Sequence, residues 1–136
     1  MQTLLRSTVI VAILFLTHMA VAQQPTKQIE LSATQIEGYL AAQPEMVAIQ
    51  KKILFGELSG KDPRVIGDMA EVARKHGLGL AEYSDVLTNM ILVFNRIDPK
   101  TKTLIDPNAQ PPIEHPGNID LVIKYYDRIS HAFLGD

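Results

Sequence analysis

The stretch LAEYSDVLTNMILVFNRI, residues 80–97, decides the fold class of this chain. Its apolar residues recur at spacings of three and four for more than four turns, with polar residues on the opposite side. This is the period of an α-helix that buries one face. The apolar stripe of the predicted helix is Leu80, Tyr83, Val86, Leu87, Met90, Ile91, Phe94 and Ile97. Asp98 and Pro99 predict its end, because a proline inside a helix removes one backbone hydrogen bond.

Upstream of this helix, a second segment is predicted to form the centre of the core. Ser32 and Gln35 have the spacing of a capping box, and Leu31 can pack on Ile36, so a helix is expected to begin here. Pro44 either kinks one long helix or opens a second one. The residues after it form a broad apolar surface, which favours coverage by neighbours on more than one side. Its members are Met46, Val47, Ile49, Ile53, Leu54 and Leu58.

Two further helices are marked by the residues at their ends. Asp62 followed by Pro63 is a helix cap with proline at the first helical position, and Gly77 suits the left-handed residue after a helix. Asn118 is predicted to cap the last helix. The apolar stripe of that helix is Ile119, Val122, Ile123, Tyr126, Ile129 and Phe133. No sequence segment sustains the alternation of a strand, so we predict an all-α fold, a small antiparallel bundle of four or five helices.

Residues 1–22 have the three parts of a cleavable secretory signal. Arg6 lies in a short n-region, residues 8–16 are apolar, and residues 20–22 read Ala-Val-Ala, which predicts cleavage after residue 22. The apolar run is shorter than the roughly 20 residues that a membrane-spanning helix needs. We therefore expect an exported protein, periplasmic or secreted, without stable membrane insertion after cleavage.

The part of the chain that follows the signal is expected to form one domain. Residues 23–30 are polar and aperiodic, which favours a flexible leader, and residues 31–136 are predicted to be a single helical domain. The chain of 136 residues has a net charge of −2 with both signs mixed, which argues against nucleic acid or anionic lipid as its partner. It contains no cysteine, so disulfides and thiolate chemistry are excluded.

A proline-rich connection over residues 98–117 is the main candidate for an interaction site. It holds five of the eight prolines, and irregular connections of this length are usually either binding loops or disordered; both alternatives remain open. Apolar residues among the prolines are placed to hold the segment against the bundle. The candidate interaction residues are Leu104, Ile105, Pro111, Pro112 and Ile113. A groove between helices is the second candidate surface, lined by Met46, Ile53, Met90 and Tyr126.

One polar pair is the candidate for catalysis or metal binding. Asp127 lies four residues before His131 on the same side of the last predicted helix, so a carboxylate and an imidazole are neighbours. With Glu114 and His115, such a pair would make a metal-dependent or His/Asp hydrolase. A pair of solvent-facing side chains is the alternative, because both positions lie off the apolar stripe. No phosphate-binding, nucleophile or haem-attachment motif is present, so the sequence favours a protein without cofactor or metal that is not an enzyme.

Two sets of residues resemble known groups of exported helical proteins. Residues 31–35, Leu-Ser-Ala-Thr-Gln, resemble the Leu-Thr-x-x-Gln signature of the periplasmic Spy and CpxP proteins, with one copy and a serine in place of threonine. This resemblance implies a chaperone-like envelope stress protein. Residues 75–101 resemble small exported proteins of proteobacteria, which implies a periplasmic helical domain and no active site. We expect an exported protein that binds a protein, a peptide or a small apolar ligand, with the chaperone and the hydrolase as alternatives.

Overall fold

The computed structural model describes residues 26–135, and this part of the chain folds into five α-helices with no strand among them. The helices are α2 (Ala33–Leu54), α3 (Pro63–Lys75), α4 (Leu80–Phe94), α5 (Gly117–Lys124) and α6 (Tyr126–Leu134). The predicted all-α fold is thereby confirmed. The predicted signal, residues 1–22, lies outside the described residues.

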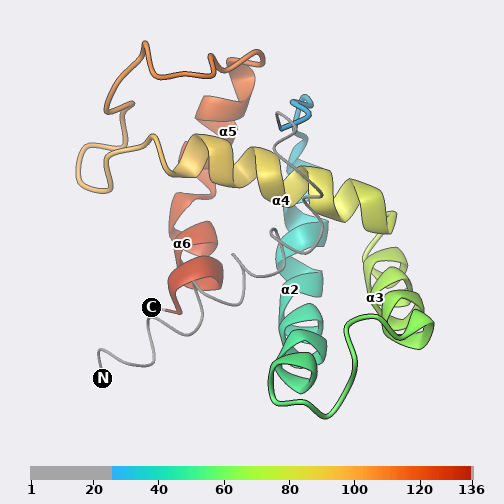
Figure 1. The fold of residues 1–136 in the computed structure, drawn as a ribbon. Helices are drawn as coiled ribbons and strands as arrows, with labels where there is room; N and C mark the ends of the chain where they lie inside the picture. Colours follow the sequence, from blue (N-terminus) through green and yellow to red (C-terminus); the bar gives the residue numbers. More distant parts are fainter. Residues whose placement is uncertain (1–25, 136) are drawn as a thin grey trace.

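Helices α2 and α4 form the centre of the bundle. In Figure 1, α4 runs across the molecule, α3 lies on one side of α2, and α5 and α6 lie on the other side. Helix α2 packs against α3, α4 and α6, while α4 also packs against α3 and α5. Every other helix therefore buries its apolar face against one or both of these two.

The helix ends follow the local sequence chemistry. The Ser32 hydroxyl accepts a hydrogen bond from the Gln35 amide at 3.1 Å, and the Gln35 side chain accepts one from the Ser32 amide at 3.0 Å, so the predicted capping box is confirmed. Asp62 caps α3, and Gly77 has the predicted left-handed conformation with φ of +83°. Pro44 lies inside the continuous helix α2, which decides between the two alternatives that the sequence left open.

The prediction for the last helix was wrong in two respects. The predicted single helix is divided into α5 and α6 at Tyr125, and Asn118 does not cap it. Pro116 occupies the cap position of α5 without a side-chain hydrogen bond, and Asn118 lies in the first turn of that helix. The Asn118 side chain instead binds the buried Leu31 amide and the half-buried Ile29 carbonyl. This long-range hydrogen bond competes with capping, because the carboxamide oxygen that accepts from the Leu31 amide cannot also accept from an amide in the first turn of α5.

Five aromatic rings connect the helices through the core. Tyr39 of α2 stacks on Tyr83 of α4 with ring centroids 4.7 Å apart and meets the edge of Phe133 of α6 at 6.3 Å. Phe133 in turn contacts Phe94 of α4 at 5.5 Å, and Phe94 stacks on Tyr126 at 4.7 Å. Burial raises the pKa of Tyr39 well above its usual value, and the adjacent Tyr83 phenol acts in the same direction.

Helix α2 approaches a neighbouring backbone closely at Gly38. A Cβ atom at this position would lie 2.7 Å from the backbone carbonyl oxygen of His76, in the connection between α3 and α4. Real Cβ atoms do not approach a backbone oxygen so closely, so glycine lets α2 pack against this connection.

One expectation about the interior was wrong. The candidate groove is closed, because Met46 and Met90 are fully buried in the core and Tyr126 is nearly so. Ile53 packs against the same core. Helix α2 is covered on more than one side, by α3, α4 and α6, as the broad apolar surface after Pro44 predicted, although Leu54 at its end is 50% exposed.

Candidate functional site

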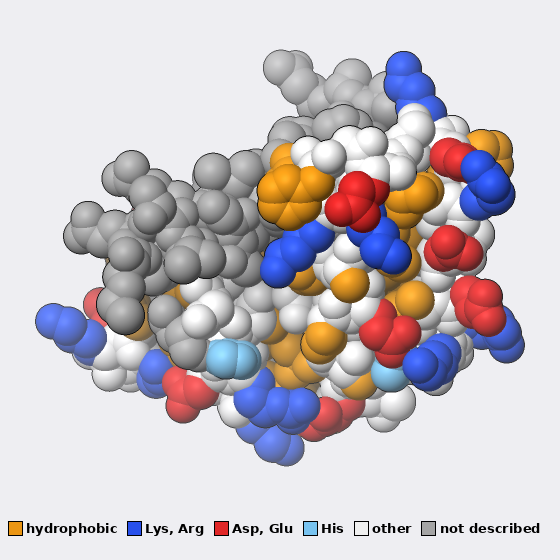
Figure 2. Space-filling model, turned by 90° about the horizontal axis from the view of Figure 1, so that it is seen from below, with side chains coloured by type: hydrophobic (Ala, Val, Ile, Leu, Met, Phe, Trp, Pro, Cys, Tyr) orange, Lys and Arg blue, Asp and Glu red, His pale blue; other side chains and the backbone are white. Residues whose placement is uncertain are grey.

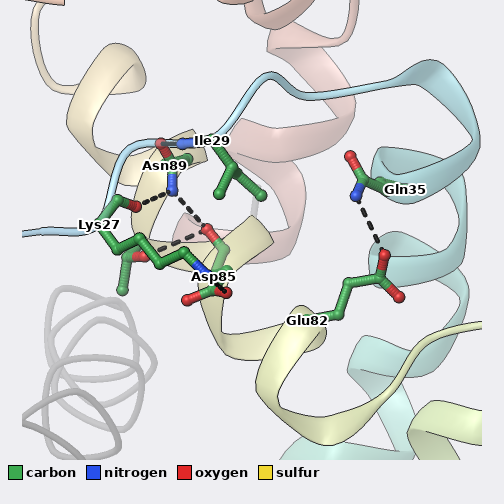
Figure 3. Close-up of polar contacts among 7 residues, drawn as sticks. Lys27, Ile29, Gln35, Glu82, Asp85 and Asn89 are labelled. Carbon is green, nitrogen blue, oxygen red and sulfur yellow. Dashed lines mark hydrogen bonds and ion pairs between the residues drawn. The ribbon is translucent and has the colours of Figure 1, made fainter. Parts of the chain in front are cut away.

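Two buried asparagines hold the N-terminal segment, residues 26–31, against the bundle. Asn89 of α4 donates to the carbonyl oxygens of Lys27 and Asp85, both at 2.8 Å, and accepts from the Ile29 amide at 3.0 Å. Figure 3 shows this side chain pointing from α4 to the backbone of the segment. Each polar atom of the carboxamide therefore has a partner, as burial of an amide requires.

Asn118 of α5 repeats this arrangement further along the segment. It accepts from the Leu31 amide and donates to the Ile29 carbonyl, both at 2.8 Å. The two asparagines thus bind backbone groups of residues 27, 29 and 31, which is the period-two pattern of an extended chain. The sequence predicted a flexible leader over residues 23–30, whereas residues 27–30 are extended and hydrogen-bonded in the structure.

The N-terminal segment also holds the connection between α4 and α5, residues 95–116. The Gln28 side chain donates to the Pro112 carbonyl at 2.8 Å and accepts from the Glu114 amide at 2.9 Å. Arg96 donates to the Pro111 carbonyl at 2.6 Å. The proline-rich half of the connection is therefore fixed by side chains that bind its backbone, because its prolines cannot supply amide donors.

The first half of the connection is a tight turn built around Asp98. Its carboxylate accepts from the backbone amides of Lys100 at 2.7 Å and Thr101 at 3.0 Å. These backbone bonds hold the pKa of Asp98 below its usual value. The Lys102 ammonium lies 3.9 Å from the centre of the Tyr126 ring, which attaches the turn to α6 by a cation–π contact.

The five candidate interaction residues of the connection do not share one environment. Leu104 and Ile113 are half-buried and pack against the core, so they hold the connection in place. Pro111 and Pro112 are exposed, and Ile105 is 66% exposed. The connection is therefore an anchored segment that exposes one large apolar side chain.

The structure gives the candidate catalytic carboxylate a cationic neighbour. The Asp127 side chain is 94% exposed and lies 3.6 Å from the Lys102 ammonium. His131 is exposed on the next turn of α6. Glu114 and His115 lie in the connection, where the Glu114 amide binds Gln28. Within residues 26–135, no three acidic or histidine side chains come together as a group that could hold a metal ion.

A shallow hollow of about 330 Å³ lies where α2 and α5 begin. Glu30, Asp120 and Lys124 contribute charges of both signs to its wall, and Asn118 also lines it, with the oxygen and the nitrogen of its carboxamide both already hydrogen-bonded. The hollow carries no unpaired buried polar group, and none is found elsewhere in the described chain. Its geometry does not select a particular ligand.

The α2–α3 tip, residues 51–66, is a feature that the sequence analysis missed. Phe55 is 73% exposed, Leu54 is 50% exposed and Ile66 in the first turns of α3 is 53% exposed. Four large hydrophobic residues of the described chain are this exposed, and three of them lie in the tip. The available sequence signal was Gly56, whose φ of +76° ends α2 and leaves Phe55 at the turn.

Comparison with known proteins identified no relative of this chain. No family model, no curated protein and no solved structure matches this chain. Among the described residues, 26–135, none of the helices has both the length and the apolar character needed to cross a membrane.

Proposed function

We propose that this protein is an exported, non-catalytic interaction protein that binds a partner protein through the connection, with Ile105 as its main apolar contact. The observation that carries the proposal is the combination of anchoring and exposure in one loop. Gln28 and Arg96 bind the backbone of residues 111–114, yet Ile105 extends into solvent.

Anchoring favours binding because the conformational entropy of the loop is lost during folding and not again on association. A loop held in its bound conformation gives more affinity for the same contacts than a disordered one does. Burying the exposed Ile105 side chain in a partner would contribute about 1.5–3 kcal/mol. The prolines also restrict the backbone conformation of their half of the connection, so a partner must be complementary to one fixed surface.

The test compares two isoleucines that are exposed to a similar extent on different parts of the molecule. A photoreactive amino acid at position 105 is used in cells to crosslink the partner, which is then purified. Ile105→Ser should weaken binding of that partner by about tenfold or more, whereas Ile66→Ser should not change it. Both variants should unfold at the wild-type urea concentration. Equal affinity of the wild type and the Ile105→Ser variant would contradict the proposal.

The exported location has its own test, because it rests on residues 1–22 alone. Mass spectrometry of the protein from the cell envelope fraction should find an N-terminus at Gln23. A protein that retains Met1 and stays in the cytoplasm would refute this part of the proposal and leave the binding surface untouched.

A further inference from the structure

We propose that the α2–α3 tip docks onto a lipid bilayer that contains anionic headgroups, with Phe55 entering the interface of the bilayer. This proposal is independent of the connection and of its partner protein. It concerns a peripheral contact made by the end of a helix pair, not a membrane-spanning segment.

The first argument is the shape of the tip. The turn between α2 and α3 forms one end of the molecule in Figure 1, so a flat surface can reach it without meeting the other helices. Phe55 occupies the turn at 73% exposure, and Leu54 precedes it. A helical partner segment would need a groove for its apolar face, whereas a protruding aromatic side chain suits the soft boundary between headgroups and acyl chains.

The second argument is charge. The tip holds four basic side chains and two acidic ones, a net charge of +2, and its basic residues are Lys51, Lys52, Lys61 and Arg64. The rest of the described chain, residues 26–50 and 67–135, holds eight basic and twelve acidic side chains, a net charge of −4. The α2–α3 tip is therefore positively charged although the chain as a whole is negatively charged. An anionic surface attracts this end and repels the remainder, which orients the molecule with its tip toward the surface.

The lysines are placed to act together with the aromatic side chain. Lys51 and Lys52 lie in the last turn of α2, three and four residues before Phe55, so the two lysines and the aromatic residue occupy neighbouring positions at the same end of the helix. Lysine side chains can keep the charge at the headgroups while their methylene groups follow the apolar surface. Figure 2, seen from below Figure 1, shows apolar side chains beside Lys and Arg side chains on this face, with Asp and Glu side chains interspersed among them.

The experiment uses the absence of tryptophan from the chain. Phe55→Trp introduces a single fluorescent reporter at the tip, and Ile105→Trp introduces one at a similarly exposed position on the connection. Each full-length variant is mixed with vesicles of equal parts phosphatidylglycerol and phosphatidylcholine, and with vesicles of phosphatidylcholine alone. Lipids brominated on the acyl chains are included as quenchers, so that quenching reports entry of that residue itself and not attachment of the chain elsewhere.

With the anionic vesicles, the emission of the Phe55→Trp variant should shift to shorter wavelength and be quenched, while that of the Ile105→Trp variant should not change. The changes Lys51→Gln and Lys52→Gln are then added to the Phe55→Trp variant. Each removes one positive charge from the tip and should weaken binding to the anionic vesicles about fivefold. The matched changes Lys100→Gln and Lys124→Gln should leave it unchanged. Salt at 1 M should also weaken binding, because the Debye length falls to about 3 Å.

Three results would overturn the proposal. Unchanged emission at position 55 with anionic vesicles would show that the tip does not enter the bilayer. A shift that depends on protein concentration without vesicles would assign the tip to a contact between two copies of the chain. A shift caused only by the partner protein of the connection would assign it to a protein interface. Because Phe55 is largely exposed, circular dichroism should confirm that the tryptophan variant keeps the wild-type fold.

Discussion

Replacing Asn118 by alanine tests how far the fold depends on a side chain that binds backbone from a distant part of the sequence. The carboxamide satisfies the buried Leu31 amide and the Ile29 carbonyl, both at 2.8 Å. The alanine methyl group can replace neither bond. A buried backbone group without a partner costs about 1–3 kcal/mol, so two such groups would cost about 2–6 kcal/mol.

The expected loss lies in the lower part of this range. Ile29 is half-buried, so water can reach its carbonyl once the segment loosens, whereas Leu31 is buried. We therefore expect Asn118→Ala to lower the free energy of unfolding by about 2–4 kcal/mol, measured by urea denaturation followed by circular dichroism. The Leu31 amide should also lose its protection in hydrogen exchange.

Asn118→Asp provides the matched control. A carboxylate at this position can still accept from the Leu31 amide but cannot donate to the Ile29 carbonyl. We expect a loss at least as large as that of the alanine variant, because the carboxylate would be buried at a position 3% exposed and would face the Ile29 carbonyl oxygen, which repels it. The reasoning is refuted if Asn118→Ala costs no more than Ser32→Ala, for which loss of a helix cap predicts about 1 kcal/mol.

Three further predictions follow from other parts of the structure. Gly38→Ala should lower the free energy of unfolding measured in urea, because the new Cβ would lie 2.7 Å from a backbone carbonyl oxygen. Gly67→Ala in α3 is the control: its Cβ would meet open space, and because alanine favours helices this variant should gain about 0.5–1 kcal/mol of stability. The free energy of unfolding should fall as the pH rises above 10.0, the ordinary pKa of tyrosine, because the pKa of Tyr39 is raised only in the folded state; this fall should be smaller in Tyr39→Phe. A protease of broad specificity should cut residues 106–114 slowly in the wild type and faster in Gln28→Ala, and equal rates would show that Gln28 does not anchor the connection.

The helix ends could be predicted because their chemistry is local. The capping box of Ser32, the cap at Asp62 and the left-handed Gly77 each depend on residues within a few positions along the chain. The outcome at Pro44 could not be decided in this way. Its ring fits one long helix only because packing of α2 on three other helices outweighs the lost hydrogen bond.

The candidate site was predicted less well, because its contacts span the whole sequence. Asn118 has the residue type and position of a helix cap, but its partners are 87 and 89 residues away. Gln28 belongs to a polar segment without periodicity, and only the fold brings it beside Pro112. Phe55 lies just past an apolar helix, where the pattern does not show that α2 extends beyond its neighbours. Local chemistry identifies caps, whereas exposure and long-range hydrogen bonds depend on where the helices stop.

The chain of aromatic rings determines the order in which the core can be completed. Phe133 lies between Tyr39 of α2 and Phe94 of α4, so a ring from the final helix closes a contact between the first helix and a middle one. During synthesis, α2 emerges long before α6, so Tyr39 can stack on Tyr83 once α4 is made, but its edge contact with Phe133 waits for the last turns of the chain. The chain therefore reaches its native packing only after nearly all of it has left the ribosome.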